Sequence, residues 1–417
     1  MKTIPCALLI SASFSVVAIA ASAPKPTFTR DVAPILYNRC AECHRAGQVA
    51  PMSLLTFKEA RPWAKSMREA VLKHTMPPWL ADPRYGHFEN DRHLEQHEID
   101  TIVAWVDAGA VEGNPAEMPA LPHFEEGWTI GKPDVVIALD REMDVPAEGV
   151  IPYKYVRVHT NFTEDKWIQA AEIRPGNRGV VHHVIVSSAP TGEAGLDSGE
   201  SARPGRAEKL CGFAPGEQPK VYPPGTAKLV KAGSDFIFQL HYTPNGKAAK
   251  DKSYIGLIFA KQPAEKRALT GTAINASFRI PPGDGNYEVR SSFTAKEDIR
   301  IIDLMPHMHL RGKDFKYTAF YPDGRSEVLL NVPRYDFNWQ LVYRYQQPVL
   351  LPKGARLECV AHFDNSPNNK FNPDPTKEVK WGPQTFEEMM IGFFDYTDES
   401  KTVQASNAAP VTVITNQ

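Results

Sequence analysis

The stretch Ile299–Leu310, IRIIDLMPHMHL, decides how the second half of the chain is interpreted. Its isoleucines and its other apolar residues favour a β-strand. On an extended strand, side chains two positions apart share a face, so His307 and His309 would lie side by side and bind one metal ion together. Two histidines at this spacing are equally typical of ordinary core or surface residues, so the metal hypothesis needs partners from elsewhere in the chain.

Short β-like runs of the same kind fill the chain beyond Pro133 and predict an all-β region of about 280 residues. That is large for one sandwich, so we expect two tandem, jelly-roll-like β-sandwich domains, at 134–265 and 266–417. Pro322-Asp-Gly324 is the expected turn of a hairpin. The other runs are Asp134–Asp140, Tyr153–Phe162, Val180–Ser188, Ser234–Thr243 and Phe315–Leu330.

The N-terminus, residues 1–23, has the three parts of a secretory signal peptide: Lys2 near the start, an apolar core and a small-residue end. We expect cleavage between Ala20 and Ala23. The apolar run is short for a membrane span and no second run follows it, so we predict a periplasmic or extracellular protein without a membrane span. A net charge of −2 leaves no basic field for nucleic acid.

Residues 24–114 are predicted to be compact and helical. In the stretch Glu98–Ala110, apolar residues recur at helical spacing and Gly109 is a plausible helix stop. The chain from 115 to 133 is rich in Pro, Glu and Gly, which indicates a linker. The fold class is therefore multidomain, with a small all-α domain before two all-β sandwiches.

The stretch Cys40–His44, CAECH, matches C-x-x-C-H, the attachment site of covalent haem c. Two thiols at this spacing, Cys40 and Cys43, can add to the vinyl groups of one haem, and His44 then binds the iron. A redox dithiol or half of a zinc site are alternatives, but the histidine and the absence of a second C-x-x-C favour one haem. We therefore predict a cytochrome c-like domain.

The sixth haem ligand is predicted to be Met76, in the stretch Lys73–Leu80, KHTMPPWL. Its prolines favour an extended loop that can present a sulfur to the iron, and a thioether raises the reduction potential. Met52 and His74 are alternative ligands. Met76 would otherwise only pack against the haem ring.

Three further histidines lie in two other β-like runs: His182 and His183 are adjacent, and His241 follows in QLHY. Adjacent residues of a regular strand face opposite ways, so one ion can bind both only at a strand end or a bulge. The stretch Arg174–Gly179, RPGNRG, just upstream is a plausible source of that irregularity. Five histidines in three β runs are a stronger indication of metal binding than any one of them.

With these motifs, residues 134–400 resemble the copper type II, ascorbate-dependent monooxygenases, which include peptidylglycine α-hydroxylating monooxygenase and dopamine β-monooxygenase. Members hold one copper in each of two β-sandwich domains. An H-H pair and a later Q-x-H-Y bind one copper, and H-x-H with a distant Met binds the other. The resemblance implies two copper ions, the first bound by His182, His183 and His241, the second by His307, His309 and Met389 of FEEMM.

The chain also departs from this family. The peptide-amidating branch places an Arg and a Tyr, which help to hold a peptide carboxylate, where this chain has Met305 and Phe393. A C-terminal glycine peptide is therefore not the expected substrate. Met390 stands where animal members commonly have a disulfide-bonded Cys, which leaves Cys359 without that partner. A bridge between Cys211 and Cys359 stays open on sequence grounds.

We therefore expect an exported monooxygenase that uses O₂ to hydroxylate a small organic molecule, with a fused haem domain supplying electrons. An external electron donor would reduce the haem. No catalytic residue is predicted beyond the metal ligands. One alternative is an exported haem and copper electron-transfer or copper-binding protein without hydroxylase activity, because ligands alone do not prove turnover. Another is a non-catalytic interaction protein.

Overall fold

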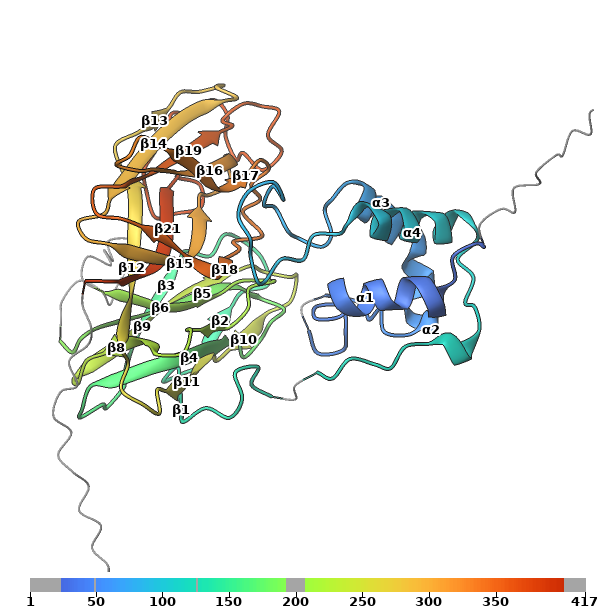
Figure 1. The fold of residues 1–417 in the computed structure, drawn as a ribbon, viewed down its shortest axis with the longest axis horizontal. Coiled ribbons are helices and arrows are strands. Elements are labelled where there is room, and N and C mark those ends of the chain that lie inside the picture. The colour runs from blue at the N-terminus through green and yellow to red at the C-terminus, as the bar shows by residue number, and fades with distance from the viewer. Residues whose placement is uncertain (1–23, 49, 125–126, 193–206, 401–417) are drawn as a thin grey trace, which may run out of the picture.

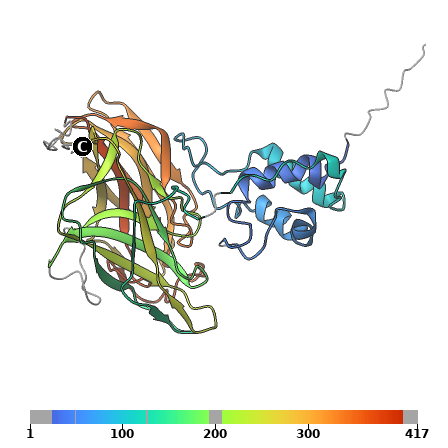
Figure 2. The same cartoon turned by 90° about the horizontal axis from the view of Figure 1, so that it is seen from below.

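The computed structural model describes residues 24–48, 50–124, 127–192 and 207–400. The predicted signal peptide, 1–23, lies outside the described residues. Strands form 39% of the described residues and helices 12%, so this part of the protein is mostly β, as predicted. Figures 1 and 2 show the helical segments gathered at one side of the molecule and the strands at the other.

The helical part contains few and short helices. Its longest, α4 (Gln96–Asp107), buries Ile99, Ile102 and Trp105 on one face and ends before Gly109, whose φ of +98° suits glycine. This helix and its stop are as predicted, whereas the expectation of a cytochrome c-like fold for the helical part stays a prediction. The other segments are η1 (Phe28–Val32), α1 (Ala33–Arg39), α2 (Phe57–Ala60), η2 (Arg61–Trp63), α3 (Ala64–Leu72) and η3 (Pro115–Glu117).

The first β half has its own hydrophobic core between two layers of strands. One layer has the order β3-β9-β5-β6 and the other β1-β11-β4-β8, with β7 paired to β4. Phe236 and Phe238 on β9 are fully buried in this core. The strands are β1 (Val135–Ala138), β2 (Met143–Val145), β3 (Lys154–His159), β4 (Lys166–Arg174), β5 (Val181–Pro190), β6 (Glu208–Phe213), β7 (Lys220–Val221), β8 (Thr226–Val230), β9 (Ser234–Tyr242), β10 (Ala249–Asp251) and β11 (Tyr254–Phe259).

The second β half packs the layer β14-β19-β16-β17 against β12-β21-β15-β18 around a second core. The predicted hairpin is present, with Gly324 at a φ of +88° in the turn between β16 and β17. The strands are β12 (Lys266–Asn275), β13 (Arg279–Ile280), β14 (Tyr287–Thr294), β15 (Ile299–His307), β16 (Gly312–Phe320), β17 (Ser326–Val332), β18 (Tyr343–Leu351), β19 (Arg356–Phe363), β20 (Val379–Lys380) and β21 (Met390–Asp398).

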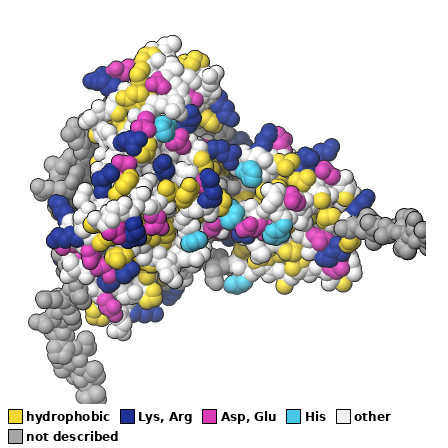
Figure 3. Space-filling model, turned by 45° about the horizontal axis from the view of Figure 1, so that its top comes forward, with side chains coloured by type: hydrophobic (Ala, Val, Ile, Leu, Met, Phe, Trp, Pro, Cys, Tyr) yellow, Lys and Arg dark blue, Asp and Glu magenta, His cyan; other side chains and the backbone are white. Residues whose placement is uncertain are grey.

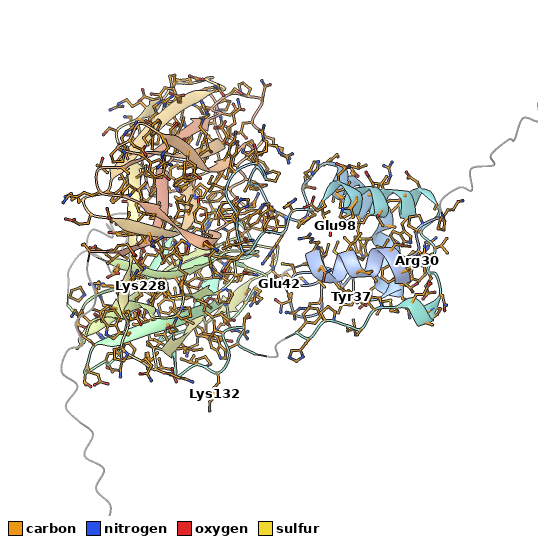
Figure 4. All side chains as sticks on the ribbon, viewed as in Figure 1. Arg30, Tyr37, Glu42, Glu98, Lys132 and Lys228 are labelled. Atoms are coloured by element: carbon orange, nitrogen blue, oxygen red, sulfur yellow. The ribbon has the colours of Figure 1, made fainter. Side chains whose placement is uncertain are left out.

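One continuous sheet joins the two halves, because β8 pairs with β12 in parallel, Thr226 opposite Lys266. Buried charges lie at this junction. Lys220 of the first half contacts Asp303 and Asp395 of the second half, the latter at 2.8 Å. Opposite charges at close range offset part of the cost of burying each one, so loss of one partner would leave an unpaired buried charge at this junction. Figure 4 shows the neighbouring Lys228 within the β part.

The segment between α3 and α4 docks on the second β half. Trp79 and Phe88 belong to its core, and their rings lie 4.9 and 5.6 Å from that of Tyr343. The backbone N–H of Asp82 donates to the Asn331 carbonyl at 2.8 Å. Figure 1 shows this segment reaching across to β17 and β18. Buried apolar contacts therefore fasten the helical part to the β part, in addition to the linker.

The four described cysteines are free thiols. Cys211 lies in the core of the first β half and Cys359 in that of the second, so the bridge left open by the sequence is not formed. In the described ranges, no helix has both the length and the apolar character needed to cross a membrane.

Candidate metal and haem sites

The first candidate site is the three-histidine cluster of His182, His183 and His241. One ring nitrogen of each lies within 4.8 Å of one ring nitrogen of the other two. His183 on β5 is directly opposite His241 on β9. The register shifts between Val181 and His183, which makes His182 an extra residue of β5. This confirms the irregularity that two adjacent histidines need in order to approach one point.

The nitrogens of this cluster are arranged as metal ligands would be. The Nδ1 atoms of His182 and His183 face each other at 3.3 Å. Two nitrogens bound to one tetrahedral ion at about 2.0–2.1 Å would be separated by roughly the same distance. Nδ1 of His241 is buried without a hydrogen-bond partner among the described residues, so its lone pair is available to an ion bound at this cluster. Nε2 of His182 is also buried and unpartnered there, and only one of the two His182 nitrogens can bind the same ion.

Burial keeps these imidazoles neutral. It lowers the pKa of His182 to about 4 and that of His241 to about 3, and the pKa of His183 is well below its ordinary value for the same reason. A neutral imidazole has the lone pair that a metal needs. Tyr153 closes one side of the cluster, with its ring 4.7 Å from that of His241.

The second candidate site is the H-x-H cluster, His307 and His309, whose ring centroids lie 5.2 Å apart. Strand β15 ends at His307, and Met308 between the two histidines points into the hydrophobic core. The alternation of an extended chain thus places both rings on one side, as predicted. Burial lowers the pKa of His307 to about 4 and that of His309 to about 3.

Hydrogen bonds through Nδ1 orient both rings. His307 Nδ1 bonds to Gln340 Oε1 at 2.9 Å, and His309 Nδ1 bonds to the Glu387 carbonyl at 3.2 Å. When Nδ1 carries the proton, Nε2 is unprotonated and has the lone pair that can bind a metal ion. Nε2 of His309 is buried and has no partner within the described part of the chain.

The chain around Met389 is held against the H-x-H cluster. The Glu388 carboxylate accepts from the backbone N–H of His309 at 2.8 Å and from that of Arg311 at 2.6 Å. The Arg311 side chain is buried and donates to the Phe386 carbonyl at 2.9 Å. Met389 is the next residue after Glu388 and is half-buried. Its role as the thioether ligand stays a prediction.

The two clusters face each other across Phe337, which lies between β17 and β18. Its ring is stacked on that of His182, with centroids 5.3 Å apart and planes 14° apart. The ring of His309 meets Phe337 at 5.9 Å and 81°. Sequence reasoning missed both Phe337 and Gln340, because they lie in an irregular loop that has no periodic pattern.

A lysine from the first β half lies next to the H-x-H cluster. Lys209 Nζ is 3.0 Å from Met305 Sδ and 5.2 Å from the centre of the Phe393 ring. This cation comes from β6, a strand of the first β half.

The C-x-x-C-H motif forms a turn at the end of α1. The backbone N–H groups of Cys43 and His44 donate to the Cys40 carbonyl at 3.1 and 2.9 Å, so both thiols and the imidazole project from one short turn. His44 Nδ1 is buried and lacks a partner among the residues described. Burial raises the pKa of both thiols, that of Cys40 to about 12, and lowers that of His44. Two thiols and an imidazole on one turn are the groups that covalent haem requires, and the haem itself stays a prediction.

The two methionines considered as sixth haem ligand lie in different places. Met52 packs against the same hydrophobic cluster as Cys40. Met76 lies beyond α3, before Trp79, where the chain crosses to the second β half. The assignment of Met76 stays a prediction, with Met52 near the proximal histidine.

The haem motif is near the β part. Glu42, inside the motif, pairs with Arg92 at 3.0 Å, and Arg92 donates to the Gly216 carbonyl of the first β half at 3.2 Å. Figure 4 shows Glu42 at the edge of the helical part that faces the strands. In Figure 3, surface histidines gather around the same junction, whereas His183 and His309 are only 4% and 1% exposed.

Comparison with known proteins adds no assignment. No family model and no curated protein sequence matches the chain. PNGF-II is 9% identical, with a TM-score of 0.27 over 63% of this chain and 64% of that one. The VP2 subviral particle of infectious bursal disease virus is 10% identical, with a TM-score of 0.19 over 66% and 75%. Oxalate decarboxylase of Bacillus subtilis is 7% identical, with a TM-score of 0.14 over 68% and 80%. Likenesses this low carry no argument about function.

Proposed function

We propose that this chain is an exported copper-dependent monooxygenase that hydroxylates a small organic substrate with O₂, and that its cytochrome c-like N-terminal domain carries a covalent haem that supplies the electrons. One observation carries the proposal. Two clusters of buried histidines, built from separate β segments, face each other with ring nitrogens that lack hydrogen-bond partners among the described residues.

The donor set favours copper at both sites. Three imidazoles at the three-histidine cluster suit an ion that changes between Cu(I) and Cu(II), and the soft thioether of Met389 beside two imidazoles favours Cu(I). Bound copper would supply the one-electron redox chemistry and the reaction with O₂ that hydroxylation of a C–H bond requires. The resemblance to the copper type II, ascorbate-dependent monooxygenases rests on the same residues.

The surrounding residues would hold the ligands in place. Gln340 and the Glu387 carbonyl fix the ring orientation of His307 and His309, so that Nε2 of each faces the site. Glu388 ties the Met389 segment to the H-x-H strand. Burial keeps the imidazoles uncharged at neutral pH, so no proton has to leave before an ion binds.

Contacts between the helical and β parts support the haem as a built-in electron donor. Glu42 and Arg92 connect the haem motif to Gly216 of the first β half, and Trp79 and Phe88 anchor the segment beyond Met76 in the second. Such a tether replaces a diffusional encounter with an effective concentration on the order of millimolar. The three-histidine cluster is the proposed entry point for electrons, because the other site must leave a position open for O₂.

Metal content and isotope incorporation test the proposal. The mature protein, secreted by a host with the haem c attachment machinery and loaded with copper, should contain one haem and two copper ions per chain. With a small-molecule library and ¹⁸O₂, oxygen consumption should accompany a product that gains one ¹⁸O atom. Zinc at both sites after copper-replete expression would rule out the proposed monooxygenase activity. Copper without oxygen incorporation would favour the electron-transfer alternative.

A further inference from the structure

The loop between β17 and β18, which we call the bridge segment (residues 333–342), touches both histidine clusters. Phe337 is its centre and is 9% exposed. Its ring is parallel to that of His182 at 5.3 Å, and it lies 6.3 Å from that of His241 and 5.9 Å from that of His309. One side chain therefore contacts imidazoles of both clusters.

The bridge segment is anchored on either side of Phe337. Tyr335 Oη donates to the Met308 carbonyl at 2.8 Å and accepts from the Met308 N–H at 3.2 Å, which ties it to the backbone between His307 and His309. On the other side, Gln340 bonds to His307 at 2.9 Å. Because Tyr335 and Gln340 are both hydrogen-bonded to the H-x-H segment, the Phe337 ring between them has little freedom to leave the space between the clusters.

We propose that Phe337 is a positioning residue that forms a shared wall between the two metal sites, fixing their separation and excluding water between them. The inference rests on the proposed function, which supplies the two ions. An aromatic ring is rigid and apolar, so it fills this space without offering a ligand or a hydrogen bond to water.

The shared sheet gives this wall a fixed frame. The ladder between β8 and β12 and the buried Lys220 contacts join the halves that carry the two clusters. The separation of the sites is then set by packed side chains, and the proposal requires no movement of one half relative to the other.

The bridge segment also reaches the helical part. Arg334 Nη1 donates to the Lys73 carbonyl at 3.3 Å, and Nη2 donates to that of His74 at 3.5 Å, two residues before Met76. The same ten-residue loop thus contacts both histidine clusters and the segment that holds the predicted haem ligand.

The test compares Phe337→Ala, Phe337→Leu and Phe337→Tyr with Phe371→Leu, an exposed phenylalanine of the same β half. In metal-free protein, the rate at which diethylpyrocarbonate modifies His182 and His241 is followed by peptide mass spectrometry. The wall predicts a several-fold faster modification for Phe337→Ala, a smaller increase for Phe337→Leu, and wild-type rates for Phe337→Tyr and Phe371→Leu. Thermal unfolding of each variant identifies any general loss of structure, and Phe337→Leu keeps the test valid if the alanine variant does not fold.

A second measurement reads the separation itself. In fully oxidised, copper-loaded protein, dipolar broadening of the Cu(II) EPR spectrum reports the distance between the ions. The wall predicts weaker or more heterogeneous broadening in Phe337→Ala and no change in Phe371→Leu. The proposal is wrong if Phe337→Ala and Phe337→Leu fold and both show wild-type modification rates and wild-type dipolar broadening. If no copper binds, the proposed function fails, while the modification rates still decide whether Phe337 seals the histidines.

Discussion

His183 and His241 are directly opposed across β5 and β9, with ring centroids 4.9 Å apart. The pair is formed by strand register, and the bulge at His182 adds a third ring to it. A ladder with a central, mostly buried strand such as β9 has little freedom to slip, because a shift by one residue would turn its core side chains outward. The three-histidine cluster is therefore built into the first β half.

His183→Ala should remove one of the two copper ions and leave the other in place. His183 lies on β5, directly opposite His241 on β9, and we expect no flexible segment to supply another nitrogen at this place. The measurement is copper content per chain by mass spectrometry, together with the haem spectrum, which should be unchanged. His97→Ala, on the exposed face of α4, is the matched control and should keep both ions. Two full copper equivalents in His183→Ala would contradict the assignment.

Met389→Ile should weaken Cu(I) binding at the H-x-H cluster and lower activity strongly, because isoleucine has a similar size but no sulfur. Competition with a Cu(I) chelator measures the affinity. The adjacent Met390 is fully buried and its sulfur accepts from the Ser291 hydroxyl at 3.1 Å, so Met390→Ile should affect thermal stability and leave Cu(I) affinity largely unchanged. The reverse pattern would assign the sulfur ligand to Met390.

Met76→Ala should open the sixth position of the haem iron, remove the weak far-red absorption band of thioether ligation and lower the reduction potential. Met52→Ala is the comparison, because Met52 packs against the same hydrophobic cluster as Cys40 of the C-x-x-C-H motif. It should disturb packing and leave the band in place. If only Met52→Ala removes the band, Met52 is the ligand.

Electron transfer from haem to copper should be intramolecular. Protein with reduced haem is loaded with Cu(II) without oxygen, and haem reoxidation is followed in a stopped-flow instrument. A first-order rate independent of protein concentration is expected, because the helical part is fastened to both β halves. Replacing His182 and His183 by Ala should abolish it. A rate proportional to concentration would show that the haem serves a separate partner.

Asp82 should make the docking of the helical part acid-sensitive. The hydrogen bond from Arg84 is the main cause that lowers the Asp82 pKa from 3.8 to about 2, and Asn331 Nδ2 donates to the same carboxylate at 3.3 Å. A depressed pKa stabilises the fold above pH 4, and this contribution is lost as the pH falls from about 4 to about 2. Circular dichroism during acid titration should show a smaller loss of stability over this window in Asp82→Asn.

At neutral pH, Asp82→Asn should lower the free energy of unfolding by about 1–3 kcal/mol, the usual contribution of hydrogen bonds to a charged group. Urea titration measures this difference. Asp323→Asn is a suitable control, because Asp323 also pairs with an arginine, Arg325, but in an exposed turn within one hairpin. Equal acid sensitivity in the wild type and in Asp82→Asn would argue against this role for Asp82.

Local patterns in the sequence were sufficient for much of the architecture. The alternating runs predicted the strands that carry the histidines, and Pro322-Asp-Gly324 predicted the hairpin between β16 and β17, because strand period and turn chemistry are properties of neighbouring residues. The helix at Gln96–Asp107 and its stop at Gly109 followed from helical spacing in the same way.

Only the tertiary structure decided how these elements meet. The parallel pairing of β8 with β12, the docking of Trp79 and Phe88 on the second β half, and the position of Phe337 join residues that are distant in the chain. Such contacts depend on strand register and on the shape of two packed cores, and neither leaves a period in the local sequence. The sequence by itself identified the candidate haem and metal residues, because their motifs are local; the packing of the two β halves decided that one phenylalanine contacts both histidine clusters.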